Sequence, residues 1–507
     1  MSLISTRFHA VMLRLSIFVL LTFLCSCAST IKEVPTRNVV MFDEYSRLLD
    51  PTGNTECTNT SPQLCTGKHL TIKNYNQLDE AQRNKYLDEL FDEVKAWKGK
   101  RRLLIFVHGG LNTQTGSIKR VKELTPKIEA ADYYPLFVNW RASWAFNYFE
   151  HLLYIRQGEE WKWYFGYPTS LVVLAYDIGR AVLRAPLVWG YQVYAGFQVE
   201  RGAPLPYELA QREEILKAEQ EAHPEHAIHI ASGEDKRSDG EVVYSWVSGI
   251  FLSPFRFISS PLIDSFGTSA WDNMLRQTQL LLHPMTEYVD GHPNKRQGDL
   301  AAVMERIRDE LKKLKQGKDQ WEIVLVGHSM GTIVINELLR AFPDLPVDKI
   351  VYMAAACSVR DVEQSVLPYL RQNTTTKFYN LSLYHMAEEG EIHYLDLVMR
   401  GSLLSWIDDF FANPMTPRDK TYGQYANFLR TEQICPANLN EPNPEFEQIC
   451  PPQLRVRIYQ KEFSYGKSVS DTDPQKHGDF DRCPFWDERF YSPEPSAKDP
   501  KLVCSED

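Results

Sequence analysis

The segment "WEIVLVGHSMGTIVINELL", residues 321–339, decides the fold class. Four apolar residues, Ile323 to Val326, lead directly into the turn sequence "GHSMG" (327–331), and an apolar-patterned segment follows. A short continuous apolar run bounded by glycine is typical of a strand that is buried on both faces. The pattern therefore predicts a strand, a tight turn with Ser329 at its tip, and a helix.

Strand-like runs recur on both sides of this segment and alternate with helix-like periods. We expect strands at 103–107, 133–140, 349–357, 376–384 and 454–460, the last as an edge strand, and helices at 77–98, 115–131 and 297–316. Strands that alternate with helices predict an α/β fold with a mostly parallel sheet flanked by helices. Residues 28–76 are polar and short of periodic segments, which favours a linker with a small disulfide-clipped flap.

The interval from Gly110 to Gly327 is much longer than one strand and two helices need. We expect about 142–295 to be a large, mainly helical cap inserted over the active edge of the sheet. Between Tyr133 and Phe197, 19 of 65 residues are aromatic. These aromatic residues indicate either an apolar substrate region or simply the core of a second helical layer. Charged residues interrupt the apolar patches, so we expect no membrane-spanning helix there.

Composition and charge limit the classes of function. The chain has 507 residues, of which 43% are hydrophobic, and a formal net charge of −10. An acidic chain without a block of lysine and arginine argues against a nucleic-acid partner. The sequence contains no P-loop, dinucleotide fingerprint or Cys-x-x-Cys pair, so we expect no cofactor. The sequence does not indicate an oligomeric state.

The first 27 residues form a separate unit. Two arginines precede a short apolar run, Leu15 to Leu24, and "LCSC" (24–27) follows. This pattern resembles the lipobox of bacterial lipoprotein signal peptides, which implies a signal peptide at 1–26 and acylation of Cys27. An ordinary secretory signal and an uncleaved anchor are the alternatives. The resemblance implies a lipid-anchored protein of the cell envelope, and Ala28 points to the outer membrane, facing the periplasm.

Seven cysteines follow Cys27, and their spacing agrees with export to an oxidising compartment. Six of them lie in polar stretches and form neighbouring pairs in the sequence: Cys57 with Cys65, Cys435 with Cys450, and Cys483 with Cys504. Six cysteines allow fifteen pairings, so spacing does not establish this one. Cys357 ends an apolar run and is expected to be a free, buried thiol.

A serine is not nucleophilic by itself, and the rest of the chain offers the groups that could activate it. The "GHSMG" sequence fits the G-x-S-x-G nucleophile elbow, in which Gly327 and Gly331 allow the strand and the helix to approach closely. His108-Gly109-Gly110 ends an earlier strand, where an oxyanion-binding loop would lie. We expect the backbone N–H groups of Met330 and Gly110 to bind the oxyanion, with Leu111 as the alternative to Gly110, and His108 to shape the loop.

These motifs resemble the α/β-hydrolase superfamily, over about 101–142 and 296–490. The resemblance implies a domain of about 99–507, preceded by an extension at 27–98, and the chain order serine, acid, histidine. Of the three histidines after Ser329, only His477 leaves room for an acid, so His477 is the expected base. The acid should follow the strand at 376–384. We favour Glu388, and the alternatives are Glu389, Asp408 and Asp409.

The resemblance implies a membrane-anchored serine hydrolase that cleaves an apolar or lipid-like acyl ester through an acyl-enzyme. An amidase or thioesterase would use the same triad. A non-catalytic envelope lipoprotein on the same scaffold is the alternative from another class. Three histidines in "HPEHAIH", His223, His226 and His229, have metal-like spacing, but their charged surroundings favour a solvated loop rather than a metal site.

Overall fold

The structure is a computed structural model that describes sixteen stretches of the chain. These are residues 38–43, 46–49, 80–110, 112–153, 155–156, 159–160, 163–200, 205–222, 228–283, 285–289, 292–296, 298–316, 321–393, 396–431, 457–492 and 502–505. The expected signal peptide with Cys27, the cysteine pairs 57–65 and 435–450, and the residues Leu111, His223 and His226 lie outside the described residues.

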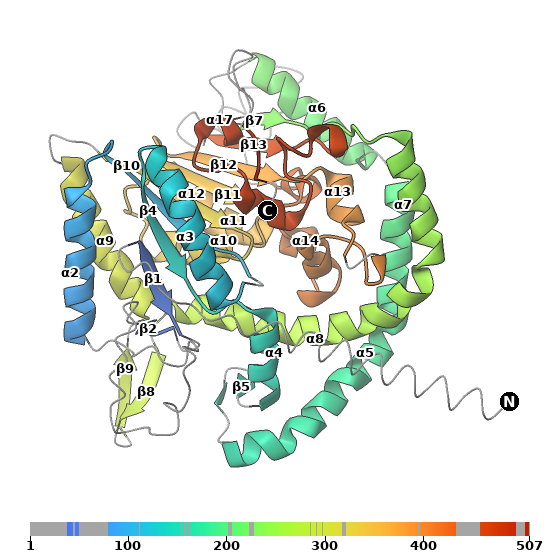
Figure 1. Cartoon of the computed structure of the whole chain (residues 1–507), viewed down its shortest axis with the longest axis horizontal. Helices are drawn as coiled ribbons and strands as arrows, with labels where there is room; N and C mark the ends of the chain where they lie inside the picture. Colours follow the sequence, from blue (N-terminus) through green and yellow to red (C-terminus); the bar gives the residue numbers. More distant parts are fainter. Residues whose placement is uncertain are drawn as a thin grey trace, which may run out of the picture.

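Nine strands form the central sheet, in the order β2-β1-β4-β3-β10-β11-β12-β13-β7. Their bounds are β1 Val39–Phe42, β2 Leu48–Leu49, β3 Arg102–Val107, β4 Tyr134–Asn139, β7 Ile228–Ala231, β10 Glu322–His328, β11 Lys349–Met353, β12 Lys377–Ser382 and β13 Ile458–Glu462. Every neighbouring pair is parallel except β1 with β2. The expected α/β class with a mostly parallel sheet is therefore confirmed (Figure 1).

Helices follow most of these strands and flank the sheet. They are α2 Glu80–Ala96, α3 Gln114–Ala130, α9 Asp299–Gln316, α10 Gly331–Ala341, α11 Val359–Gln364, α12 Val366–Gln372, α13 His385–Gly390, α14 Leu403–Trp406, α15 Tyr425–Phe428 and α17 Glu488–Tyr491, with a π-helix η4 at Ile407–Phe411 and 3₁₀ turns η5 Pro417–Asp419, η7 Lys467–Val469 and η8 His477–Arg482. The predicted strand, turn and helix around Ser329 are β10, the turn 329–330 and α10.

The core lies between the sheet and these helices because the central strands are apolar on both faces. All residues of β10 after Glu322 are buried, and all five residues of β11 are buried. β10 pairs with β3 on one side and β11 on the other, with Val326 opposite both Phe106 and Val351. The three strands therefore end side by side, and the loops at their carboxyl ends lie close together.

The segment expected to be a cap is mainly helical. It contains α4 Trp144–Leu153, α5 Trp163–Glu200, α6 Tyr207–Ala222, α7 Asp239–Phe251 and α8 Ser253–Leu280, with the hairpins β5 Ile155–Arg156/β6 Glu159–Glu160 and β8 Met285–Val289/β9 His292–Arg296. Figure 1 shows α5, α7 and α8 as an arc around one side of the molecule. In the described part of the chain no single helix is long and apolar enough to cross a membrane, and one bent pair, Asp239–Gly249 with Ser253–Leu280, passes by length and composition alone.

Two expectations about the sheet edges are wrong. β13 is not an edge strand, because β7, which belongs to the cap segment, pairs with it in parallel. His229 is therefore in a strand rather than a solvated loop, and its ring stacks on Tyr459 with centroids 4.6 Å apart. At the other edge, β1 and β2 come from the segment expected to be a linker. β1, β2 and β7 have at most four residues each, too few to show a period within a polar stretch.

Candidate active site

Ser329 lies on a tight turn between β10 and α10, with a backbone conformation that serine seldom adopts. Its φ is +52°, in the left-handed region. The Ser329 N–H donates to the Met353 carbonyl over 2.9 Å, and the Ser329 carbonyl accepts from the Ala356 N–H over 3.2 Å. Both bonds go to the end of β11 and the residues that follow it, so the neighbouring strand holds the strained turn in place.

Glycines surround the turn because no side chain would fit there. A Cβ atom at Gly331 would lie 2.2 Å from the Val107 carbonyl oxygen, and one at Gly327 would lie 2.7 Å from Ile335 Cδ1. A Cβ atom at Gly109 would lie 2.7 Å from the Ser329 Cβ. The loop after β3 therefore packs directly on the serine, as the expected elbow requires.

Ser329 and His477 meet, although 148 positions separate them in the sequence. The Ser329 Oγ lies 2.9 Å from His477 Nε2, and both residues are buried. Burial, with smaller contributions from His328 and His393, lowers the pKa of His477 well below its ordinary value. The imidazole is therefore neutral near pH 7, and a neutral imidazole bonded to a serine hydroxyl can accept its proton.

The backbone of His477 is held on both sides. The His477 N–H donates to the Glu391 carboxylate over 3.0 Å, and the His477 carbonyl accepts from His328 Nε2 over 3.1 Å. His477 begins the 3₁₀ turn η8, and the preceding Lys476 N–H donates to Asp479 over 2.9 Å. Two carboxylates thus bind successive N–H groups where the turn begins. They hold the backbone of the segment 467–483, which we call the histidine loop, at the start of η8.

The expected acid, Glu388, does not reach His477. Its carboxyl group accepts a hydrogen bond from the Ser402 hydroxyl, and its second oxygen is buried and has no hydrogen-bond partner in the described part of the chain. Burial is the main reason that the pKa of Glu388 is raised well above its ordinary value. The Nδ1 atom of His477 is also buried, and no described residue is hydrogen-bonded to it. Glu388 belongs to α13, whose turn directs this side chain toward the start of α14.

The three alternative acids are not joined to His477 either. Asp408 accepts hydrogen bonds from Thr421 and Asn427, so it holds the chain together around η4. Burial raises the pKa of Asp408 to about 6 and that of Asp409 to about 8, and it also raises the pKa of Glu389. Asp408 is buried, Asp409 and Glu389 are partly exposed, and the three carboxyl groups form an acidic cluster at α13 and η4.

Glu391 is the carboxylate that sequence analysis missed. It lies in "HMAEEGE" (385–391), after β12, where an acid was expected, but Glu388 and Glu389 were considered instead. Glu391 follows the last residue of α13 and is free to turn toward η8. Burial raises the pKa of Glu391 to about 7, although its bond to the His477 N–H acts in the opposite direction. The position after a short helix was the only available signal.

The loop after β3 also has the expected form. The Trp140 N–H donates to His108 Nε2 over 3.2 Å, so the proton of His108 is on Nδ1, which lies 2.7 Å from the Gly109 carbonyl. Burial lowers the pKa of His108 to about 4. His108 thus shapes the loop. Among the described residues, the N–H groups of Gly110 and Met330 donate no hydrogen bond, and a Cβ at Gly110 would lie 2.7 Å from Met330 Sδ.

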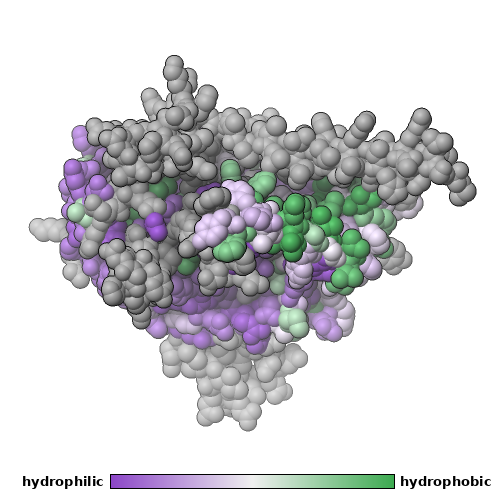
Figure 2. Space-filling view, turned by 90° about the horizontal axis from the view of Figure 1, so that it is seen from below, coloured by the Kyte–Doolittle hydropathy of each residue, from purple (hydrophilic) through white to green (hydrophobic). Residues whose placement is uncertain are grey.

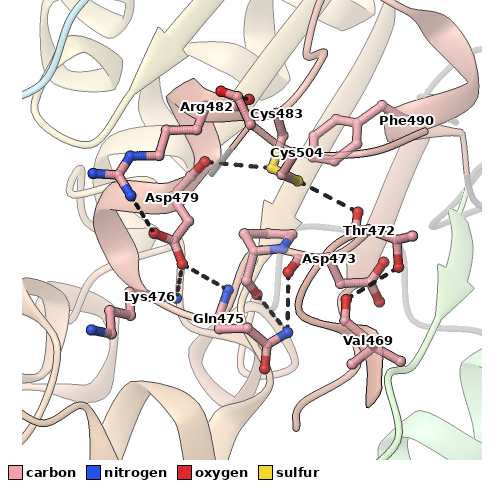
Figure 3. The surroundings of a disulfide bond; sticks show 12 residues. Val469, Thr472, Asp473, Gln475, Lys476, Asp479, Arg482, Cys483, Phe490 and Cys504 are labelled. Carbon is pink, nitrogen blue, oxygen red and sulfur yellow. Dashed lines mark hydrogen bonds and ion pairs between the residues drawn. A yellow bond between two sulfur atoms is a disulfide. The ribbon is translucent and has the colours of Figure 1, made fainter. Parts of the chain in front are cut away.

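A disulfide closes the other side of the histidine loop. Cys483 and Cys504 are bonded, with Cα atoms 4.1 Å apart, as their spacing predicted (Figure 3). The Cys504 N–H donates to the Asp471 carbonyl over 2.8 Å, so the C-terminal segment is tied to the loop. A polar cavity of about 480 Å³ lies here, lined by residues that include Glu391, Lys476 and Arg482 but not Ser329.

No family model matches the chain, and no curated protein or solved structure is significantly similar to it. The interpretation of the site therefore depends on its own geometry. Cys357 is free and buried, as expected, and burial raises the pKa of its thiol to about 12, so it is not a second nucleophile. In the described region no group of three or more His, Cys, Asp or Glu side chains is placed to hold a metal ion.

Proposed function

We propose that the chain is a serine hydrolase with the α/β-hydrolase fold, which cleaves a carboxylic ester of an apolar acyl group. One observation supports this proposal above the others. The Oγ of a serine in the left-handed conformation lies 2.9 Å from the Nε2 of a buried, neutral histidine. An ordinary glycine-rich loop has no need for a strained serine hydrogen-bonded to a distant imidazole.

In the proposed mechanism, Ser329 Oγ attacks the acyl carbonyl while its proton moves to His477 Nε2. The N–H groups of Met330 and Gly110 donate to the oxygen that becomes negative. His477 then gives the proton to the leaving alkoxide, which departs as an alcohol. Water attacks the acyl-enzyme, loses a proton to His477, and releases the carboxylic acid and the free Ser329 hydroxyl.

The orienting acid in this proposal is Glu391 rather than Glu388. Its carboxylate already binds the backbone N–H of His477 over 3.0 Å, and among the described residues His477 Nδ1 has no acceptor of its own. An imidazole that takes up the serine proton on Nε2 carries its other proton on Nδ1, and because Nδ1 is buried, this N–H needs an acceptor within the protein. Glu391 supplies it by turning its carboxylate from the N–H to the ring of the same residue.

The unsatisfied Nδ1 also favours one rival, a non-catalytic envelope protein on the same scaffold. A fluorophosphonate probe separates the two because it labels only an activated serine. We expect labelling of the full chain, loss of labelling in Ser329→Ala and His477→Ala, and normal labelling in Ser470→Ala, which removes an exposed hydroxyl of the neighbouring polar cavity.

Hydrolysis of a short soluble ester should fall by about 10³-fold or more in either triad variant, and the double variant should be scarcely worse. Equal labelling of the parent and Ser329→Ala would overturn the proposal. An amidase or thioesterase would label in the same way, and parallel assays with amide and thioester substrates identify the preferred acyl bond.

The proposed location is the cell envelope, with the chain held at the outer membrane by acylated Cys27 and facing the periplasm. More than one acyl chain gives stable attachment, at roughly 0.8 kcal/mol per buried CH₂. Cys27→Ser should prevent incorporation of labelled fatty acid and the cleavage that depends on it. Continued labelling of this variant would exclude the lipoprotein assignment.

A further inference from the structure

The outer face of the cap helices is apolar over an unusual length. Along α5 and α7 it exposes Leu171, Tyr176, Leu183, Tyr244, Trp246 and Phe251. The exposed fraction reaches 84% at Leu183 and 75% at Phe251. Exposed apolar residues recur four or seven positions apart along each helix and form a stripe on it: Val172, Tyr176, Leu183 and Leu187 on α5, and Val243, Val247 and Phe251 on α7. Figure 2 shows hydrophobic residues gathered over one region of the surface seen from below. We call the outer side of α5, α7 and the start of α8 the cap face.

The polar side chains of α5 point the other way. Between Trp163 and Val199 its charged residues are Asp177, Arg180 and Arg184. Asp177 is buried and accepts from the Tyr148 hydroxyl over 3.0 Å. Arg180 donates to the Ser265 carbonyl over 2.8 Å, and Arg184 pairs with the buried Asp264 of α8 over 3.3 Å. Each of these three charged side chains therefore has its partner inside the cap, between helices.

The same inversion holds from Val242 of α7 to the start of α8. No charged residue occurs from Val242 to Phe255. The acidic residues of α7, Asp239 and Glu241, lie in its first turn. Its serines, Ser245 and Ser248, face the buried Arg400, which donates to the Ser248 hydroxyl over 2.9 Å. The first charged residue of α8, Arg256, is also buried and pairs with Asp396 over 3.6 Å.

A face with apolar residues outside and hydrogen-bonded charges inside reverses the order found on the surface of a protein in water. Proteins in contact with lipid have this arrangement, because hydrocarbon accepts apolar side chains while buried charges need partners within the protein. A protein partner would meet no charged side chain on the cap face that could fix its orientation or give specificity. Tyrosine and tryptophan on the face suit the boundary between headgroups and acyl chains.

We propose that the cap face docks on a lipid bilayer, with α5 and α7 lying along the membrane surface and their apolar side chains in the acyl region. This contact is separate from any anchor at the N-terminus. It does not depend on catalysis by Ser329. It follows from side-chain placement alone, so failure of the hydrolase proposal would leave it unchanged.

The test uses the full chain and phosphatidylcholine vesicles whose acyl chains carry bromine, which quenches tryptophan only at close range. Trp246 is 54% exposed on the cap face, so its emission, obtained by subtracting that of Trp246→Phe, reports contact with the acyl chains. We expect the Trp246 signal to fall by at least half on vesicle binding. The loss should persist at about 1 M salt, where the Debye length is about 3 Å, because the attraction is apolar.

Leu183→Glu combined with Phe251→Glu places two charges on the cap face. Both positions are exposed, so the fold does not depend on the side chains that are replaced. We expect this variant to lose the quenching of Trp246 even if its N-terminus still attaches to the vesicle. Met415→Glu is the matched control, since Met415 is 89% exposed outside the cap face, and it should behave like the parent.

Equal quenching of the parent and the double variant would overturn the proposal, as would absence of quenching in the parent. A second copy of the chain could cover the cap face instead of a bilayer, and sedimentation without vesicles tests this alternative. If the parent is a dimer and the double variant is a monomer, the cap face is a protein interface and the bilayer proposal is overturned.

Discussion

At the residue scale, the site depends on where two glutamates point. Glu388 and Glu391 are three positions apart and both are buried, but one meets the Ser402 hydroxyl and the other meets the His477 N–H. Burial raises the pKa of both carboxyl groups, and the pKa of Glu391 is about 7. In the proposed mechanism, Glu391 must be ionised to accept Nδ1–H, and its carboxyl group titrates in the neutral range.

This pKa makes a prediction about the pH profile. Glu391 is mostly protonated below about pH 7, while His477, with its lowered pKa, stays neutral there. We expect ester hydrolysis to fall as the pH is lowered through about 7, because the orienting carboxylate is lost before the base becomes charged. Glu391→Gln should reduce kcat by about 10²-fold or more and remove this limb from the profile.

Glu388→Gln is the matched control for that prediction. It keeps the shape of the side chain and removes an ionisable carboxyl group from the same short segment. This variant should retain the fall in rate near pH 7 and most of the activity. If Glu388→Gln rather than Glu391→Gln abolished the limb, the original sequence-based choice of acid would be correct.

At the element scale, the contact between α10 and β3 leaves no room for a side chain. A Cβ at Gly331 would lie 2.2 Å from the Val107 carbonyl oxygen, whereas a Cβ at Gly478, also near the site, would meet no atom of the described residues within 4 Å. Gly331→Ala should therefore lower the free energy of unfolding by about 1–3 kcal/mol, the usual cost of overpacking, and reduce activity. Gly478→Ala should leave the urea midpoint nearly unchanged, and a comparable loss in both variants would contradict this explanation.

The disulfide between Cys483 and Cys504 is the second element-scale device. It closes a segment with a sequence separation of 21 and lies six positions beyond His477, in the same loop. Replacing both cysteines with serine should cost roughly 3 kcal/mol of stability and should weaken activity through the histidine loop. A thiol reductant should affect the parent in the same way but change the double variant little. Thermal unfolding and ester hydrolysis measure both effects. If the double variant matched the parent in both assays, the disulfide would not position His477.

At the scale of the whole molecule, carboxyl groups with raised pKa values link stability to pH. Burial raises the pKa of Asp409 to about 8, that of Glu391 to about 7 and that of Asp408 to about 6. The folded chain therefore holds protons that the unfolded chain has already released. Stability from these groups is fully present below their ordinary pKa values, and it is lost as the pH rises through about 8.

Asp409→Asn should remove one of these titrations. At pH 8 the variant should be more stable than the parent by about 1 kcal/mol or more, and the gain should shrink at pH 5, where Asp409 is protonated in the folded parent. Urea unfolding at the two pH values measures the difference. A gain of equal size at both values would show that packing, and not the charge, is responsible.

Sequence alone determined the parts of this protein that have local causes. The apolar run of β10, the glycines of the turn and the helix after it all act within a few residues of Ser329, so their pattern was sufficient. His477 was predicted as the partner of Ser329, because the expected chain order left one histidine at a suitable distance after the acid, and the two side chains do meet. Cys483 and Cys504 were paired because nearby cysteines in a polar stretch meet easily.

Only the tertiary structure decided the features that depend on contacts between distant segments. β1 and β7 are strands because β4 and β13 offer them an open edge, and a four-residue run has no pattern of its own to show it. The choice between Glu388 and Glu391 depends on whether Ser402 or His477 lies opposite, and the inward direction of Asp177 and Arg184 depends on the helices packed against α5. The chemistry of a side chain determines what kind of partner it needs, and only its position in the tertiary structure determines which residue that partner is.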